Sequence, residues 1–296
     1  MLHTLIQAVG FGVAAGAVIA LGAVGFSVQF GISNILNITY GALMTLAAYL
    51  GLFLVDAGLS AWVALPLVGI AVGVASVLFH RGLLAPLVRR GTRSFAIVIV
   101  TVAASIVLQY IIVAIVGPQA KTYGAQSGNT FHVLDVSLTT AQVTIILLTV
   151  ALMLALHLLL TRTTLGRAMR ATSSNRTLAQ SCGIATDRIS DLAWLISGTL
   201  CGAAGVALAI TVVSFDFTLG AIFLIPMIAA AVLGGIGQPY GAMVGALVVG
   251  VASEVAGAFS DPVYKDVVAF LILIVMLLIR PRGLFGAAWS ARRLMA

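Results

Sequence analysis

Long stretches without a charged side chain dominate this sequence of 296 residues. The first charged side chain is that of Asp56. Further uncharged runs cover residues 57–80, 95–116, 139–160, 192–215 and 217–253. Since a helix needs about 20 apolar residues to cross the hydrocarbon core of a bilayer, the longest runs hold two crossings each. With 61% hydrophobic and 8% charged residues, the composition also indicates an integral membrane protein made of helices.

The apolar runs divide into about nine transmembrane helices, with eight to ten as the range that their lengths allow. We expect spans near residues 4–28, 35–55, 60–79, 95–116, 139–160, 192–213, 219–235, 240–258 and 264–279. The expected fold is therefore an all-α, polytopic bundle in the inner membrane. One domain over residues 1–296 forms it, and residues 161–190 are a long loop within that domain.

The basic residues are gathered between the predicted spans. Four arginines follow the third span, five lie within residues 161–190, and four follow the last span. The positive-inside rule places these three segments in the cytoplasm, which puts the N-terminus outside and the C-terminus inside. Although the sequence pI is near 10.0, the charges do not form a stripe along one face. We therefore expect a lipid bilayer and no nucleic acid as the partner of this chain.

The loop over residues 161–190 is too long for a plain hairpin and contains helix signals. Thr163 or Thr164 can cap a first short helix, and Ser174 or Asn175 can cap a second. Gly183 is placed to end the second helix in the left-handed conformation. The simpler alternative is that the arginines serve only topology and attraction to anionic lipid headgroups. That alternative does not account for a folded loop.

A small apolar face is expected on the second of these short helices. Leu178 and Cys182 are four residues apart, so they lie on the same side of a helix.

Two predicted spans are irregular. The second opens with polar residues at membrane depth, and the seventh is short, contains Pro226 and ends in glycines. Broken or short helices in a membrane must be buried in protein or line a polar cavity, and paired ones point to a transporter's path. The alternative is that glycine and proline are common in membrane helices. The candidate solute path is lined by Asn37, Thr39, Tyr40, Thr45 and Pro226.

Small residues recur four positions apart, a spacing that lets helix backbones approach closely. They predict a tightly packed bundle and occur at Gly12/Gly16, Gly69/Gly73, Gly198/Gly202 and Gly237/Gly241/Gly245.

Catalytic and cofactor motifs are missing from the sequence. It has no P-loop for ATP, and its four histidines lack metal-ligand spacing. We therefore expect no catalytic residue, cofactor or metal site. Glu254 falls within a predicted span, near its outer end, and a boundary or partner-contact role suits it better than ion coupling. Energy for uphill transport would then enter through another protein.

Three segments resemble the permease subunits of branched-chain amino acid ABC importers, in particular the smaller, LivH-type subunit. The segment "ILNITYGALMTLAAY" is similar to a family segment at Asn37, Gly41, Ala48 and Tyr49, but differs at Thr39 and Tyr40, where the family has Ala and His. "AAAVLGGIGQPYGAMVGALVVGVASE" and "RPRGLFG" resemble the family's C-terminal third. "LGRAMRATSSNRTLAQSCGIATDRI" resembles its cytoplasmic loop at Gly166, Arg167, Ala168, Arg170, Ala171, Asn175, Ala179, Gly183 and Ile184.

The resemblance implies a permease that has no ATP site of its own and couples to separate ATPases. The implied partners are two ABC ATPase subunits, a second permease chain or another copy, and an extracytoplasmic solute-binding protein. The implied coupling residues in the loop are Gly166, Arg167, Arg170, Asn175, Ala179 and Gly183. The alternatives are a permease of the same family for urea or short amides, a secondary transporter that works alone, and a structural membrane scaffold.

Overall fold

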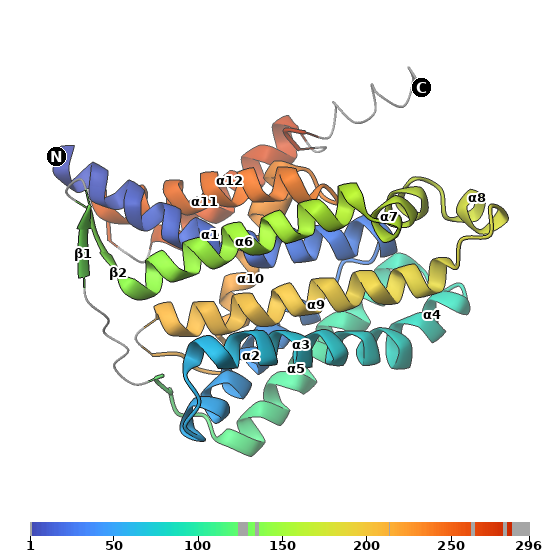
Figure 1. Ribbon diagram of the computed structural model, residues 1–296, viewed down its shortest axis with the longest axis horizontal. Coiled ribbons are helices and arrows are strands. Elements are labelled where there is room, and N and C mark those ends of the chain that lie inside the picture. The colour runs from blue at the N-terminus through green and yellow to red at the C-terminus, as the bar shows by residue number, and fades with distance from the viewer. Residues whose placement is uncertain are drawn as a thin grey trace.

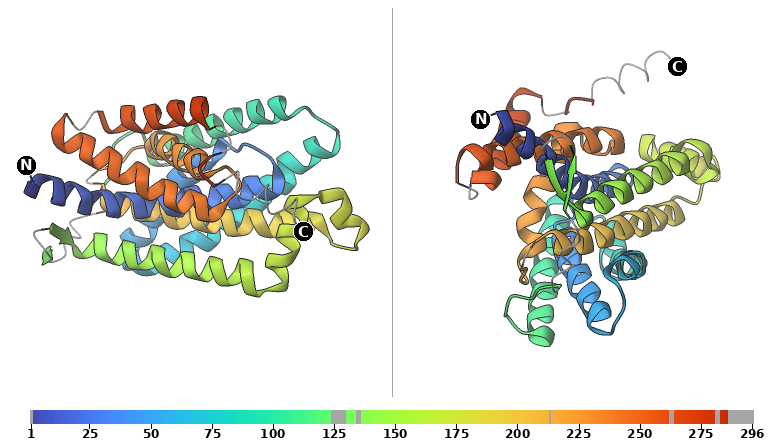
Figure 2. Two further views of the ribbon diagram at one scale, coloured as in Figure 1. Left: turned by 90° about the horizontal axis from the view of Figure 1, so that it is seen from above. Right: turned by 60° about the vertical axis from the view of Figure 1, so that its left-hand side comes forward.

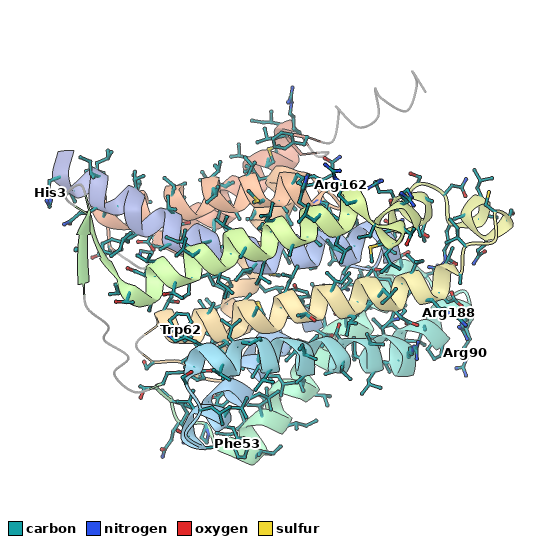
Figure 3. All side chains as sticks on the ribbon, in the orientation of Figure 1. His3, Phe53, Trp62, Arg90, Arg162 and Arg188 are labelled. Atoms are coloured by element: carbon teal, nitrogen blue, oxygen red, sulfur yellow. The ribbon has the colours of Figure 1, made fainter. Side chains whose placement is uncertain are left out.

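The computed structural model describes residues 2–123, 130–133, 136–212, 214–261, 264–280 and 283–285. Its long helices run roughly along one axis of an elongated bundle (Figure 1). Arg90 and Arg188 lie at one end of the molecule, which we call the arginine end. His3 lies at the other, which we call the N-terminal end (Figure 3).

Every predicted span coincides with a helix, so the prediction of an all-α membrane bundle is confirmed. Seven of these helices are long and apolar enough to cross a membrane. The helices at the nine predicted positions are α1 (Leu2–Ser33), α2 (Thr39–Asp56), α3 (Ala61–Phe79), α5 (Ser94–Val116), α6 (Thr140–Arg162), α9 (Thr186–Thr211), α10 (Leu219–Gly234), α11 (Pro239–Phe259) and α12 (Tyr264–Ile279).

The second and seventh spans are irregular in different ways. Helix α1 ends at Ser33. Residues 34–38 connect it to α2 without helical structure, and α2 begins only at Thr39. Helix α10 has 16 residues, which gives a length of about 24 Å, short of the roughly 30 Å of hydrocarbon. Pro226 lies inside α10 but does not end it. The seventh span is therefore short, as predicted, but it is not broken at its proline.

The centre of the bundle is formed by α1, α2 and α9. In the most apolar part of α9, 78% of the residues are buried inside the protein, against 17% in α6. Figure 1 shows α9 running through the middle of the molecule, while α10 crosses between the α2–α3 side and the α11–α12 side. The outer helices α5 and α6 present large apolar side chains outward, as Phe95, Ile115 and Leu147 do. Such a surface suits contact with lipid tails.

The predicted close packing at glycines is confirmed between α3 and α9. A Cβ atom on Gly198 would lie 2.8 Å from the Cα atom of Gly73, and one on Gly202 would lie 2.8 Å from that of Gly69. Real Cβ contacts are essentially never that short, so the two backbones approach this closely only because all four residues are glycines.

Short elements close the two ends of the bundle. At the arginine end lie η1 (His80–Leu84), α4 (Ala85–Arg89), α7 (Thr164–Ser174) and α8 (Arg176–Ser181). At the N-terminal end, β1 (Thr130–Val133) and β2 (Val136–Thr139) form an antiparallel pair in which Thr130 faces Thr139 (Figure 2). This small ribbon was not expected from the sequence. It leads directly into α6, which Thr139 and Gln142 start with a capping box.

Candidate functional site

The loop between α6 and α9 is folded as two capped helices, as the sequence predicted. The Thr163 hydroxyl accepts a hydrogen bond from the Gly166 N–H at 3.0 Å, which starts α7. The Asn175 side chain accepts from the Leu178 N–H at 3.0 Å, which starts α8. Each cap satisfies an N–H that the first turn of a helix leaves without an internal partner, so the direction of each helix is fixed.

Gly183 ends α8 in the left-handed conformation, with φ of 82°. The Gly183 N–H donates to the carbonyl of Gln180 at 2.9 Å, and the Ile184 N–H donates to that of Ala179 at 3.0 Å. These two bonds form a Schellman motif, in which the glycine avoids the strain that a side chain would meet. Ala179 is buried. The turn into α9 is therefore defined by the backbone.

Gly166 and Arg170 hold α7 against the end of α6. A Cβ atom on Gly166 would collide with the carbonyl oxygens of Leu159 and Leu160. One turn further on, the Arg170 guanidinium donates to the Leu160 carbonyl, which the helix end leaves without a partner. The angle between α6 and α7 thus depends on a residue without a side chain and on one arginine.

The outward face of the loop remains available for contact. Arg167 is exposed, and its side chain has no hydrogen-bond or salt-bridge partner among the residues that the structure describes. Leu178 is 61% exposed, and Cys182 beside it is exposed too. The predicted apolar face of α8 therefore exists, but it does not pack against this chain.

Asp187, in the first turn of α9, joins α8 to α4. One of its carboxylate oxygens accepts from Arg176 at 2.8 Å, and the other accepts from Arg89 at 3.1 Å. All three side chains are largely exposed, so each pair adds little stability, about 0–1 kcal/mol. Basic side chains from two different elements nevertheless meet at one carboxylate.

Asp191 lies one turn further along α9 in a more enclosed place. It accepts from Arg81 at 2.9 Å and lies 3.1 Å from Nδ1 of His80, whose ring stacks on Trp194. Consecutive residues of an α-helix point about 100° apart. His80 and Arg81 belong to the π-helical turn η1, and this turn aims both at the same carboxylate.

A cavity of about 420 Å³ opens between these elements at the arginine end. Its lining includes the four arginines Arg81, Arg89, Arg176 and Arg188 as well as Asp187 and Asp191.

The candidate path residues on α2 and before it are all buried within this one chain. The Thr39 hydroxyl donates to the Thr101 carbonyl of α5 at 2.7 Å. The Tyr40 hydroxyl lies 3.1 Å from the Gly22 carbonyl of α1 and 3.2 Å from the Ser197 carbonyl of α9. These two side chains bind neighbouring helices to α2, which is a structural role.

Thr45 connects α2 to the beginning of α10. Its hydroxyl accepts from the Gly220 N–H at 3.0 Å, which satisfies one free N–H of the first turn of α10. A Cβ atom on Gly220 would collide with the carbonyl of Gly41, so the two helices touch through glycine backbone. Pro226 is buried on α10. The structure thus brings Thr45 and α10 together, as the pairing of the two irregular spans predicted.

Asn37 differs from the other candidates. It is 0% exposed, and neither its amide nitrogen nor its amide oxygen has a hydrogen-bond partner among the described residues. Leaving a buried polar group without a partner costs about 1–3 kcal/mol. A water or a solute polar group is the kind of partner that would remove this cost.

Glu254 has a structural partner. The ammonium of Lys265 on α12 lies 2.8 and 2.7 Å from its two oxygens, so α11 and α12 are joined at the N-terminal end.

Several residues of these sites were not expected from the sequence. Asp187 and Asp191 are four residues apart, so they lie on one face of α9, next to the arginine-rich loop. That spacing could have indicated a shared set of arginine partners. The other unexpected residues, His80, Trp194, Thr101 and Ser197, carry no local signal, because their roles depend on which helices are neighbours.

Comparisons with known proteins identify relatives over almost the whole chain. The sequence model of a family described as "Branched-chain amino acid transport system / permease component" matches residues 9–277. The LivH permease of Escherichia coli (strain K12), named as part of a high-affinity branched-chain amino acid transport system, is 31% identical over 93% of each chain. BraD of Pseudomonas aeruginosa, named in the same way, is 31% identical over 96% of each chain.

A solved structure of PsaBC from Streptococcus pneumoniae in complex with Fab covers 95% of this chain and 91% of its own, with a TM-score of 0.47 and 16% identity. That similarity is too weak to carry an argument. The family match and the two relatives, each similar over most of its length, together show the family of this chain. This chain belongs to the family of permease components of branched-chain amino acid transport systems.

Proposed function

We propose that this chain is the membrane-spanning permease subunit of an ATP-driven importer for branched-chain or similar small amino acids. It has no ATP site of its own and works with two ATPase subunits, a second permease chain or another copy, and an extracytoplasmic binding protein. The observation that carries this proposal is the folded element α7–α8. Membership of the permease family supports it.

The α7–α8 element is suited to transmit a motion. Both of its helices are capped, and Gly166 and Arg170 seat α7 on the end of a transmembrane helix. Its outward side keeps Arg167, Leu178 and Cys182 exposed. An ATPase bound there would therefore move α6 through α7, and α9 through Asp187 and the Gly183 turn. Arg167 offers a charge and Leu178 an apolar contact for the docked partner.

The substrate class is proposed from the relatives. LivH and BraD are named as permeases of high-affinity branched-chain amino acid transport. A small aliphatic zwitterion needs uncharged hydrogen-bonding groups and apolar walls along its path, and the membrane interior of this chain offers that mixture. We place the path along α2 and α10, where Asn37, Thr39, Tyr40, Thr45 and Pro226 lie. Within it, Asn37 faces the solute, while Thr39, Tyr40 and Thr45 hold the helices in place.

A secondary transporter is the main rival in another class. Such carriers usually keep a carboxylate within the membrane for ion coupling. Glu254 is neutralised by Lys265 at 2.7 Å, which argues against that role for it. Energy from a partner ATPase remains the better account.

Uptake into reconstituted vesicles tests the proposal. Vesicles that contain the permease, its ATPases and the binding protein should accumulate leucine only when ATP is supplied. Import of urea or a sugar instead of leucine would reject the substrate class. Leucine import by the permease alone, driven by an ion gradient, would reject the ABC assignment.

The proposed orientation has a separate test that uses a native cysteine. Cys182, directly after α8, is exposed, and Cys201 is buried. If the arginine end is cytoplasmic, a membrane-impermeant thiol reagent should leave Cys182 unlabelled in intact cells and label it after permeabilisation. Cysteine at Ala120, which is exposed at the opposite end, should be labelled in intact cells. Tyr123 is unsuitable as this reporter, because its side chain is buried and donates to the Ala48 carbonyl.

A further inference from the structure

A second cavity, of about 310 Å³, lies at the N-terminal end where α10 begins. Its walls are mainly apolar and include Leu208, Val212, Leu219, Ile222 and Phe223. Among the described residues that line it, Asp216 is the charged one. A mainly apolar cavity with a single charged group is the usual form of a site for a small organic ligand.

Asp216 is held in a fixed direction. Its Oδ1 atom accepts from the backbone N–H of Thr218 at 2.9 Å and from the Thr218 hydroxyl at 2.6 Å. The neighbouring Phe215 exchanges two backbone hydrogen bonds with Lys121, at 2.8 and 2.9 Å, which anchors the segment. The carboxylate is therefore positioned by its own turn and by the loop after α5.

Asp216 lacks a cation. It is partly buried, yet no basic side chain within the described residues lies at salt-bridge distance from it. At the same end Glu254 is also partly buried, but Lys265 neutralises it. Burial of an ionised carboxylate is costly unless a counter-charge pairs with it. Asp216 accepts two hydrogen bonds from Thr218, but the opposite charge has to come from a ligand.

The walls decide which kind of cation fits. Ca²⁺ and Mg²⁺ take about six or more oxygen ligands, and most of this lining is hydrocarbon. An organic ammonium group attached to an aliphatic chain fits both the Asp216 carboxylate and the apolar wall. The first turn of α10, which forms one wall, touches α2 through Gly220 and Thr45. A ligand held here would lie next to the proposed path.

We propose that this cavity is an entrance site that binds the α-ammonium group of an aliphatic amino acid through Asp216 and its side chain through the apolar wall. The proposal rests on the proposed function, because it assigns the cavity to the imported solute. It goes beyond that function by giving the permease its own contact with the solute, in addition to the binding protein's.

Protection of a cysteine from labelling tests the site directly. Ser214 lines the cavity and is exposed, so Ser214→Cys in a Cys182→Ser background gives a reporter. In the purified complex, leucine should slow the reaction of Cys at 214 with a thiol reagent. Isopentylamine, which keeps the ammonium and the branched chain, should also slow it. Neither 4-methylpentanoate, which lacks the ammonium, nor ethanolamine, which lacks the chain and represents a lipid headgroup, should protect.

Asp216→Asn supplies the decisive variant, because an asparagine oxygen can still accept both bonds from Thr218. The leucine concentration for half protection should rise about tenfold, which corresponds to about 1.4 kcal/mol for one charge-assisted contact. Asp56→Asn, at an exposed carboxylate of the same end, is the matched control and should change nothing. Unchanged protection in Asp216→Asn, or equal protection by 4-methylpentanoate, overturns the proposal.

A second measurement tests the proposal even if the Ser214→Cys variant does not assemble with its partner subunits. In vesicles, isopentylamine should compete with leucine uptake in the wild-type protein, and Asp216→Asn should raise the apparent KM for leucine more than it lowers the maximal rate. Leucine uptake that is normal in both respects in Asp216→Asn contradicts the entrance site while leaving the proposed function intact. Absence of any ATP-driven leucine uptake by the wild-type complex contradicts the proposed function itself.

Discussion

At the arginine end, Asp187 and Asp191 each lie between two basic side chains from neighbouring elements, whereas Asp216 at the N-terminal end has no such partner among the described residues. The basic side chains that contact these two aspartates come from η1, α4 and α8, so the ion pairs join α9 to the end of the segment α3–η1–α4 and to α8. Among the described residues, the hydrogen bonds that Asp216 accepts come from its own turn. At the first end both aspartates join parts of the protein, whereas at the second end Glu254 pairs with Lys265 and Asp216 is left for a ligand.

The backbone follows the same division. Around the arginine end, capped helices and the Gly183 turn fix each change of direction. Both ends have a cavity, but the one at the arginine end is lined by four arginines and two aspartates, and the one between the start of α10 and the loop after α5 is mainly apolar. We infer that one end transmits motion and that the other receives the solute. Four sets of substitutions test this contrast and are given in order of decreasing expected effect.

Gly166→Ala should have the largest effect. The added Cβ atom would collide with backbone carbonyls of Leu159 and Leu160, so α7 must leave its seat on α6. ATP-driven leucine uptake should fall to the level measured without ATP, while the protein stays in the membrane. Gly82→Ala is the matched control, because a Cβ atom there meets no other atom within 4 Å. Normal uptake in Gly166→Ala would remove α7 from the coupling mechanism.

Asn37→Leu should separate stability from transport. The buried amide of Asn37 has no partner among the described residues, so replacing it with an apolar side chain should keep or raise the melting temperature of the purified complex. Uptake should nevertheless fall, because the solute loses a polar contact.

Thr45→Val is the comparison for Asn37→Leu, since it removes the acceptor for the Gly220 N–H and should lower the melting temperature. A lower melting temperature in Asn37→Leu as well would mean that the amide has a structural partner.

Asp191→Asn should destabilise the protein more than Asp187→Asn does. The Asp191 side chain is 15% exposed and that of Asp187 is 61% exposed, and water screens the second far more. Thermal unfolding of the two variants measures the difference. High salt should reduce the difference in melting temperature between wild type and Asp187→Asn. It should leave most of the difference that Asp191→Asn causes. Equal losses would show that burial does not distinguish the two ion-pair sites.

Thr163→Ala and Asn175→Ala should have the smallest effects. Loss of a helix cap costs about 1 kcal/mol, so each variant should fold and keep partial uptake. Combining the two should loosen the starts of both α7 and α8 and reduce uptake further. Proteolysis of the loop in inside-out vesicles would report this directly, with faster cleavage in the double variant than in either single one.

Much of the fold could be predicted because membrane helices carry a strong local signal. The absence of charge located each span, and the side-chain caps and Gly183 located α7 and α8 before their contacts were known. Asn37 could also be singled out, because an amide in an apolar segment is conspicuous by itself. Local chemistry was sufficient in each of these cases.

The rest depends on which helices are neighbours. Thr39 and Tyr40 looked like path residues, but their hydrogen bonds to Thr101, Gly22 and Ser197 can be found only from the packed bundle. The missing partner of Asp216 is likewise a property of the surroundings, since an aspartate after a span looks the same with or without a nearby lysine. The sequence also gave no sign that α10 would continue through Pro226.

The amount of ATPase that remains bound to the purified permease tests most directly whether the two ends have separate tasks. Wild type, Gly166→Ala and Asp216→Asn would be purified in parallel in mild detergent, and the ratio of ATPase to permease measured for each. We predict that Gly166→Ala loses the ATPase subunits and that Asp216→Asn retains them at the wild-type ratio. Full retention by Gly166→Ala, or loss by Asp216→Asn, would contradict the division.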